Sequence, residues 1–149
     1  MKTVKKLTAQ QSVRVRFGEV DSMNIVWHGN YLKYFEEGRE TFSRQYGFNY
    51  IHLAEEGYIM PVIDVQIQYI KPLRYGDTAL VETTWIDTEA AKAVFEYRIR
   101  NAADGSLCCR GRTTQVFLNS ERQLEFTYPP YVQAWREQWI PDEETQPVS

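Results

Sequence analysis

Residues 30–47 read NYLKYFEEGRETFSRQYG, and their apolar side chains recur at the three- and four-residue spacing of an α-helix. The polar side holds Lys33, Glu37, Glu40 and Arg44, and the apolar side holds Tyr31, Tyr34, Phe35, Gly38, Phe42 and Tyr46. A glycine on the buried side costs about 1 kcal/mol of helix stability relative to alanine, but it lets another backbone come close. The stretch predicts an amphipathic helix that ends near Gly47 and lies tightly on a sheet.

Strand patterns stand on both sides of this helix. Residues 12–17, SVRVRF, alternate apolar and polar side chains, as a strand with one buried face does. Four more stretches of strand character follow the helix, with the turns PLRYGD and NAADGS among them: 59–70, 78–87, 92–101 and 106–118. One strand, one long helix and consecutive strands predict an α+β fold, with an antiparallel sheet wrapped around or packed on the helix.

The chain has 149 residues, of which 43% are hydrophobic, so we expect one domain over 1–149 with a sizeable core. The stretch YPPYVQAWREQW predicts a short helix near the end, because Pro130 suits a first helical turn and Val132, Trp135 and Trp139 share one side. This helix is expected to cover an edge of the sheet. Residues 139–149 are expected to form a flexible tail.

Charge and composition argue against nucleic acid and membranes as partners of this protein. The formal net charge of -3 gives no broad attraction for a phosphate backbone, so nucleic acid is not expected as the main partner. The first residues, MKTVKKLTAQQ, lack the apolar run of a secretory signal or anchor, and no stretch has membrane-spanning length. We therefore expect a soluble, cytoplasmic protein without membrane insertion.

The interval between the first strand and the helix, FGEVDSMNIVWHGNY, holds the candidate chemistry. Asp21 lies in a predicted loop, and residues from Trp27 to Tyr31 approach the helix start, where unpaired N–H groups and the helix dipole favour a negatively charged oxygen. A carboxylate near such donors can act on a carbonyl as general base or nucleophile. The alternative is that Asp21 and Asn24 only shape the turn and that His28 is a buried structural histidine.

Residues 17–40, FGEVDSMNIVWHGNYLKYFEEGRE, resemble the signature of the 4-hydroxybenzoyl-CoA thioesterase-like acyl-CoA thioesterases of the hotdog superfamily. The signature residues are an aromatic, an acidic pair and a Tyr-x-x-Tyr-Phe-Glu-x-x-Arg helix, here Phe17, Glu19, Asp21, Tyr31, Tyr34, Phe35, Glu36 and Arg39. The stretch YIKPLRYGD is similar to a strand-ending turn of the family, so the likeness covers nearly the whole chain. It implies a hotdog fold, a curved antiparallel β-sheet around one long central helix.

The resemblance also implies functional residues. The catalytic aspartate of the family falls on Asp21, and its histidine or asparagine before the helix falls on His28. Asn24 stands where the family often has glycine, and asparagine tolerates the left-handed backbone that such a loop requires. Trp27 is expected to line the acyl pocket or a subunit contact. The resemblance further implies a homodimer or homotetramer with sites between subunits.

Other side chains are weaker candidates. Some hotdog thioesterases take their carboxylate from the central helix, which makes Glu36 an alternative, although an ion pair with Arg39 or a solvated face explains it as well. Lys71 and Arg74 are candidates for the phosphates of CoA, with solvated strand ends as the alternative. Two histidines and the adjacent Cys108 and Cys109 do not make a metal site, and the cysteines are expected to be packing residues.

The predicted function is hydrolysis of an acyl-CoA thioester, with no cofactor. Asp21 acts as base or nucleophile, His28 helps position the substrate carbonyl at the helix start, and Trp27, Gly29, Asn30 and Tyr31 are expected to bind the substrate. Hydrolysis of an acyl carrier protein thioester is one alternative. A noncatalytic acyl or acyl-CoA binding hotdog protein is the other, and a hotdog dehydratase ranks below both.

Overall fold

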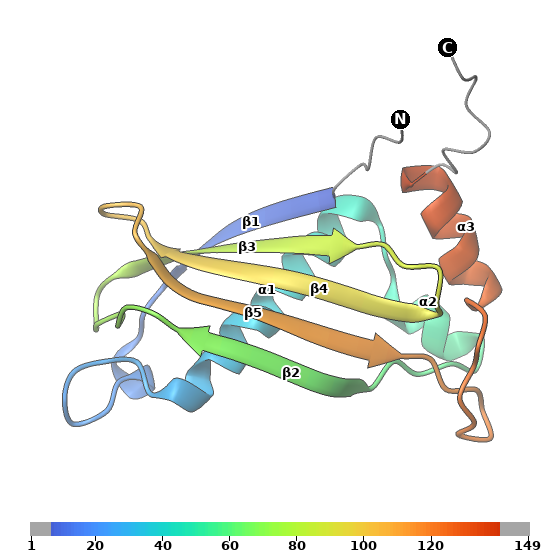
Figure 1. Ribbon diagram of the computed structural model, residues 1–149, viewed down its shortest axis with the longest axis horizontal. Helices are drawn as coiled ribbons and strands as arrows, with labels where there is room; N and C mark the ends of the chain where they lie inside the picture. The colour runs from blue at the N-terminus through green and yellow to red at the C-terminus, as the bar shows by residue number, and fades with distance from the viewer. Residues whose placement is uncertain (1–6, 141–149) are drawn as a thin grey trace, which may run out of the picture.

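A computed structural model describes residues 7–140, and it shows an α+β fold built on one antiparallel sheet (Figure 1). The five strands are β1 (Leu7–Arg14), β2 (Val62–Tyr69), β3 (Thr78–Ile86), β4 (Lys92–Asn101) and β5 (Leu107–Val116), and their order across the sheet is β1-β3-β4-β5-β2. The helices are α1 (Tyr31–Tyr46), α2 (Tyr50–Glu55) and α3 (Pro130–Trp139), with single 3₁₀ turns at Phe17–Glu19 and His28–Asn30. The predicted class is therefore confirmed.

The long helix α1 lies across one face of the sheet (Figure 1). Its buried residues all come from the predicted apolar side, of which Tyr46 is only partly buried, and Phe35 stacks on Tyr97 of β4 with ring centroids 4.2 Å apart. The helix ends where Gly47 takes a left-handed backbone with φ of 70° and donates its N–H to the Ser43 carbonyl. Both the extent and the end of the predicted helix are confirmed.

Gly38 brings α1 unusually close to the sheet. A Cβ at this position would lie 2.2 Å from Thr83 Oγ1 and 3.0 Å from Val81 Cγ1, both on β3. Because 2.2 Å is far below van der Waals contact, only glycine fits here without a shift of the helix or of the Thr83 side chain. The predicted tight packing is confirmed.

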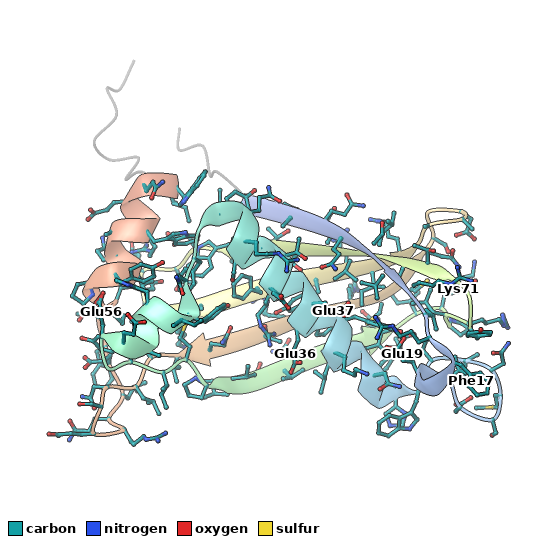
Figure 2. The ribbon with its side chains drawn as sticks, turned by 180° about the vertical axis from the view of Figure 1, so that it is seen from behind. Phe17, Glu19, Glu36, Glu37, Glu56 and Lys71 are labelled. Carbon is teal, nitrogen blue, oxygen red and sulfur yellow. The ribbon has the colours of Figure 1, made fainter. Side chains whose placement is uncertain are left out.

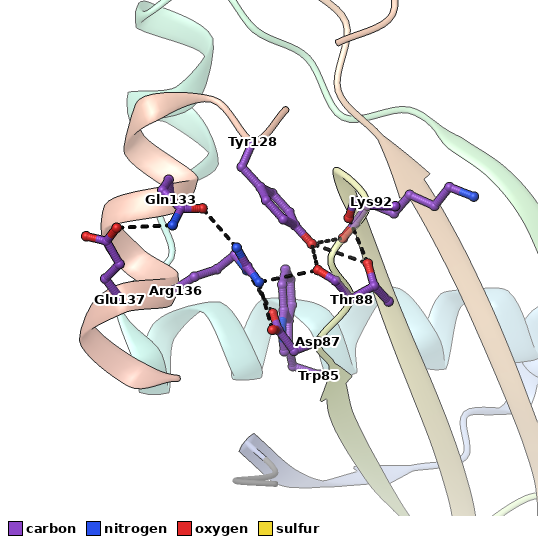
Figure 3. Close-up of polar contacts among 9 residues, drawn as sticks. Trp85, Asp87, Thr88, Lys92, Tyr128, Gln133, Arg136 and Glu137 are labelled. Atoms are coloured by element: carbon purple, nitrogen blue, oxygen red, sulfur yellow. Dashed lines mark hydrogen bonds and ion pairs between the residues drawn. The ribbon is translucent and has the colours of Figure 1, made fainter. Parts of the chain in front are cut away.

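The last helix, α3, begins at Pro130 as predicted, but it covers the end of the sheet rather than a long edge (Figure 1). Trp135 packs between α1 and β3, with its ring 4.9 Å from that of Trp85. Arg136 donates two hydrogen bonds of 2.8 Å to the carboxylate of Asp87, and its guanidinium lies 4.0 Å above the Tyr128 ring (Figure 3). Helix α3 is therefore held against the rest of the fold by the buried Trp135 ring and by the bidentate ion pair between Arg136 and Asp87. Of the tail predicted over 139–149, Trp139 is the last residue of α3, and residues 141–149 lie outside the described residues.

The largest differences from the sequence expectation concern two strands and one short helix. The first strand covers Leu7–Arg14 rather than 12–17, because the Arg16 N–H donates to the Glu19 carboxylate and the chain turns there. The strand predicted at 59–70 is shorter, Val62–Tyr69. Helix α2 was not predicted, although Asn49 caps it by accepting hydrogen bonds from two backbone N–H groups, at 2.9 and 3.1 Å.

Candidate active site

The Asp21 loop is a tight hairpin closed by its own backbone. Val20 pairs with Val26 in an antiparallel bridge, and the Asp21 N–H donates to the Ile25 carbonyl at 2.8 Å. Asn24 takes the left-handed conformation expected of it, with φ of 62°. The loop thus has a defined shape that places Asp21 just before the helix start.

The two oxygens of the Asp21 carboxylate have different surroundings. Oδ1 accepts hydrogen bonds from the N–H groups of Met23 at 2.8 Å and Ile25 at 3.4 Å. Within residues 7–140, no hydrogen bond or ion pair engages Oδ2. The turn-shaping role and a chemical role are therefore compatible, because they use different oxygens.

The helix start supplies backbone donors. The 3₁₀ turn His28–Asn30 runs directly into α1; the Asn30 N–H donates to the Trp27 carbonyl at 2.9 Å, whereas the N–H groups of His28 and Gly29 make no hydrogen bond among the described residues. The Trp27 indole lies against Gly29, where a Cβ would sit 2.1 Å from the ring. Gly29 is therefore needed for this arrangement, and Trp27 forms a wall beside the free amides.

Glu19 holds the loop and the helix together. It is only 8% exposed, and its Oε1 accepts from the Tyr34 hydroxyl at 3.0 Å and from the Arg16 N–H at 2.8 Å. Its carbonyl accepts from the Trp27 N–H at 2.9 Å and from the Asn30 side chain at 2.8 Å. Figure 2 shows Glu19 beside the first turns of α1. The side chain of Asn30, predicted to bind substrate, is thus engaged in structure.

Tyr31 lies in the core, whereas His28 lies on the surface. Tyr31 is buried, and burial raises the pKa of its phenol to about 12, so this ring stays neutral and belongs to the core. Its contribution to a site is limited to its backbone. His28 is exposed rather than buried, its ring lies 4.8 Å from that of Trp27, and its carbonyl accepts from the Tyr69 hydroxyl at 3.0 Å.

The two predicted cations lie at the same end of the molecule as the loop. Arg74 pairs with Ile25 in an antiparallel bridge, and its side chain has no partner within residues 7–140. Lys71 is exposed, and its Nζ lies 3.6 Å from Asp104 Oδ2 (Figure 2). Arg74 is thus joined directly to the loop, whereas Lys71 is linked to the β4–β5 turn.

The alternative carboxylate, Glu36, lies on α1 about two helical turns beyond His28. It stands eight residues beyond His28, which is about 12 Å along a helix axis at 1.5 Å per residue. It is exposed and makes no ion pair with Arg39 among the described residues. The structure thus puts Trp27 in contact with His28 and Gly29, places Asp21 in the hairpin that leads to them, and sets Glu36 further along α1.

Glu36 lines a groove of about 640 Å³ between α1, α2 and the end of β5. Three buried polar atoms of groove residues have no hydrogen-bond partner among the described residues: Ser43 Oγ, Tyr50 OH and Gln115 Oε1. Burial raises the pKa of Tyr50, and the nearby Ser43 hydroxyl and Arg39 charge offset part of that rise. This groove could not be predicted from local sequence patterns, because α2, which forms one wall, was not predicted and Gln115 comes from the distant strand β5.

The cysteines have the packing role predicted for them. Both are buried, and desolvation raises the pKa of Cys108 and brings that of Cys109 to about 12. Since a thiol reacts as its thiolate, we expect neither to be alkylated by iodoacetamide at pH 8 within the time that labels the unfolded protein completely. Intact mass after labelling with and without denaturant measures this; rapid labelling of the native protein would contradict it.

Two kinds of feature are missing from the part of the chain that the structure describes. Between residues 7 and 140 no three histidine, cysteine, aspartate or glutamate side chains gather closely enough to hold a metal ion. No helix in the same range is long and apolar enough to cross a membrane.

Comparison with known proteins identifies the family of this chain. The model of the thioesterase-like superfamily matches residues 15–136. YneP of Bacillus subtilis, provisionally named an acyl-CoA thioesterase, is 37% identical over 113 residues, which is 76% of this chain and 81% of YneP. The DHNA-CoA thioesterase of Staphylococcus aureus superposes with a TM-score of 0.79 at 25% identity, over 95% of this chain and 97% of that one. A 1,4-dihydroxy-2-naphthoyl-CoA thioesterase from Synechocystis has the same fold, with a TM-score of 0.78 at 20% identity over 93% of this chain and 99% of that one. An antiparallel sheet wrapped on one central helix, with these sequence relatives, means that the chain belongs to the thioesterase-like superfamily and has its hotdog fold.

Proposed function

We propose that this protein hydrolyses acyl-CoA thioesters to a free carboxylic acid and CoA. The observation that carries the proposal is the Asp21 carboxylate, with one oxygen fixed by its own loop and the other unengaged, just before a helix start that offers free backbone N–H groups. Membership of the thioesterase-like superfamily and similarity to YneP support it.

In this mechanism the substrate carbonyl oxygen accepts hydrogen bonds from N–H groups at the helix start, by Gly29. A water molecule attacks the carbonyl carbon while Asp21 takes its proton, and the negative charge that develops on the oxygen is stabilised by the N–H groups and the helix dipole. The carbon–sulfur bond then breaks and CoA leaves as a thiolate, which takes up the proton. Direct attack by Asp21 gives an anhydride that water hydrolyses to the same products.

The surrounding side chains position the substrate. Trp27, which is 50% exposed, walls the approach to Gly29, and His28 presents its exposed ring beside Trp27. Arg74 and Lys71 are suited to the phosphates of CoA because both are exposed cations at this end of the molecule. An acyl carrier protein as carrier is the alternative that these cations would also serve.

We propose a dimer formed by the free edge of β2. This edge strand exposes apolar side chains, with Ile63 at 58% and Val65 at 41% exposed, and an unpaired apolar edge is a template for pairing. A two-fold axis between the two β2 strands would make the α1 helices of the two subunits antiparallel. The helix start of one subunit would then approach the groove that Glu36 lines in its partner. Such a pairing gives a site between subunits, as the family resemblance implies.

Replacing Val65 with lysine tests the dimer. We expect Val65→Lys to convert the protein to a monomer at micromolar concentration, because a charge would have to be buried in the paired edge. Light scattering after size exclusion measures this, and thiol release is expected to fall with it. Thr84→Lys serves as control, because Thr84 is a partly exposed residue of the inner strand β3, away from the β2 edge. A wild-type monomer, or a dimer that survives Val65→Lys, would exclude pairing through β2.

Thiol release from a panel of acyl-CoAs tests the activity itself. We expect turnover for at least one class among short aliphatic, long aliphatic and aromatic acyl groups, detected with a thiol reagent. Absence of turnover together with measurable acyl-CoA binding would favour the noncatalytic binding protein. Turnover confined to acyl carrier protein thioesters would instead identify the other carrier.

A further inference from the structure

Two aromatic rings stand exposed together beside the Asp21 loop. Phe17 is 76% exposed and Tyr75 is 53% exposed, and their ring centroids lie 5.7 Å apart in an edge-to-face contact. Figure 2 shows Phe17 at the end of the molecule, beyond Glu19. Neither ring belongs to the core, so packing within this chain does not account for them.

Backbone hydrogen bonds join the two chain segments that carry these rings. The Val15 N–H donates to the Asp77 carbonyl at 2.9 Å, and the Gly76 N–H donates to the Val15 carbonyl at 3.3 Å. The segments that carry Phe17 and Tyr75 are therefore side by side. The Ile25–Arg74 bridge joins the second of them to the Asp21 loop, so the rings and the candidate catalytic carboxylate share one backbone frame.

Each ring has an arginine next to it in sequence. Arg16 precedes Phe17, and Arg74 precedes Tyr75; both arginines are exposed, and within residues 7–140 neither guanidinium pairs with a carboxylate. Asp77, the nearest acid in the turn, accepts from the backbone N–H of Arg74 at 2.8 Å instead. Exposed aromatic faces with unpaired guanidinium groups are the combination that binds a nucleobase and its phosphates.

We propose that Phe17 and Tyr75, with Arg16 and Arg74, form a platform for the adenosine 3′,5′-bisphosphate end of CoA. The adenine stacks on the exposed rings, and the two guanidinium groups bind the phosphates. The identity of the nucleotide rests on the proposed function, because CoA is the thioester carrier that has such an end. The platform places this end on the outer side of the Asp21 loop and leaves the pantetheine arm to reach the helix start.

Binding of adenosine 3′,5′-bisphosphate to the full chain, measured by titration calorimetry, tests the platform without requiring catalysis. We expect Phe17→Ala to weaken binding about 5- to 30-fold and Phe17→Tyr to restore it, because a tyrosine ring stacks equally well. Phe126→Ala is the matched control, because Phe126 is 81% exposed and makes no ring contact within the described residues. Equal affinities for wild type and Phe17→Ala, or equal losses in Phe17→Ala and Phe126→Ala, would overturn the platform.

Kinetics with two forms of one substrate separate this proposal from the proposed function. We expect Phe17→Ala to raise KM for an acyl-CoA by a similar factor, with kcat unchanged, and to leave hydrolysis of the matching acyl-N-acetylcysteamine thioester unaltered, because that thioester has no nucleotide. Equal effects on both substrates would contradict the platform. If no thioester is hydrolysed but the bisphosphate binds with the expected dependence on Phe17, the proposed function fails and the platform stands.

Discussion

Asp21→Asn is expected to lower kcat for acyl-CoA hydrolysis by about 10²- to 10⁴-fold, the range for loss of a positioned general base. Asparagine is nearly the same size, and its Oδ1 can still accept the hydrogen bonds from Met23 and Ile25 that shape the loop. What it lacks is the negative charge on the second oxygen. The substitution therefore tests chemistry while preserving structure, with thiol release as the measurement and circular dichroism as the check on folding.

Glu89→Gln is the matched control for Asp21→Asn. Glu89 is an exposed carboxylate in the turn between β3 and β4, at the far end of the sheet from the Asp21 loop, so this variant removes the same charge without touching the site (Figure 1). We expect it to keep wild-type kcat. A kcat for Asp21→Asn within threefold of wild type would exclude Asp21 as the working carboxylate and make Glu36→Gln the next variant to measure.

Trp135→Ala is expected to lower the free energy of unfolding by about 3–5 kcal/mol, the cost typical of deleting a buried large aromatic side chain. Trp135 is 4% exposed, and its ring packs against those of Phe48 at 5.1 Å and Trp85 at 4.9 Å. Its Nε1–H also donates to the Tyr46 carbonyl at 2.8 Å. Alanine would leave a cavity where α3, α1 and β3 meet, and urea unfolding measures the loss.

Trp135→Phe separates packing from hydrogen bonding at the same position. We expect a smaller loss, about 1–3 kcal/mol, because a ring remains in the cluster while the Tyr46 carbonyl loses its donor. If Trp135→Ala costs less than 1 kcal/mol, α3 is not an integral part of the folded unit. The Arg136–Asp87 ion pair would then have to hold the helix by itself.

The elements that were predicted correctly are those with a strong local pattern. Helix α1 follows from its 3.6-residue spacing and from the glycine at its end, and α3 follows from Pro130 with three apolar residues on one side. The turns after the helix were located by glycine and proline. In each case the residues that determine the element are neighbours in sequence, so no knowledge of distant segments was needed.

The roles of individual site residues were harder to predict because partners from other segments assign them. Asn30 has the amide of a substrate-binding residue, but its side chain is taken by the carbonyl of Glu19, eleven residues earlier. Tyr31 lies at the helix start, yet burial removes its phenol from the site. The start of the first strand and helix α2 were missed for a related reason: their patterns are short, and tertiary contacts decide between competing local structures.

The sequence by itself determined the class of fold, the central helix and the stretch that carries Asp21 and His28, since periodicity and local motifs depend on adjacent residues. Only the tertiary structure decided which oxygen of Asp21 is free, and that a groove lined by Glu36 opens between α1, α2 and β5. It also set Phe17 beside Tyr75, 58 residues later. The physical reason is that hydrogen-bond partners, burial and neighbouring charges come from chain segments far apart in sequence, which only packing brings together.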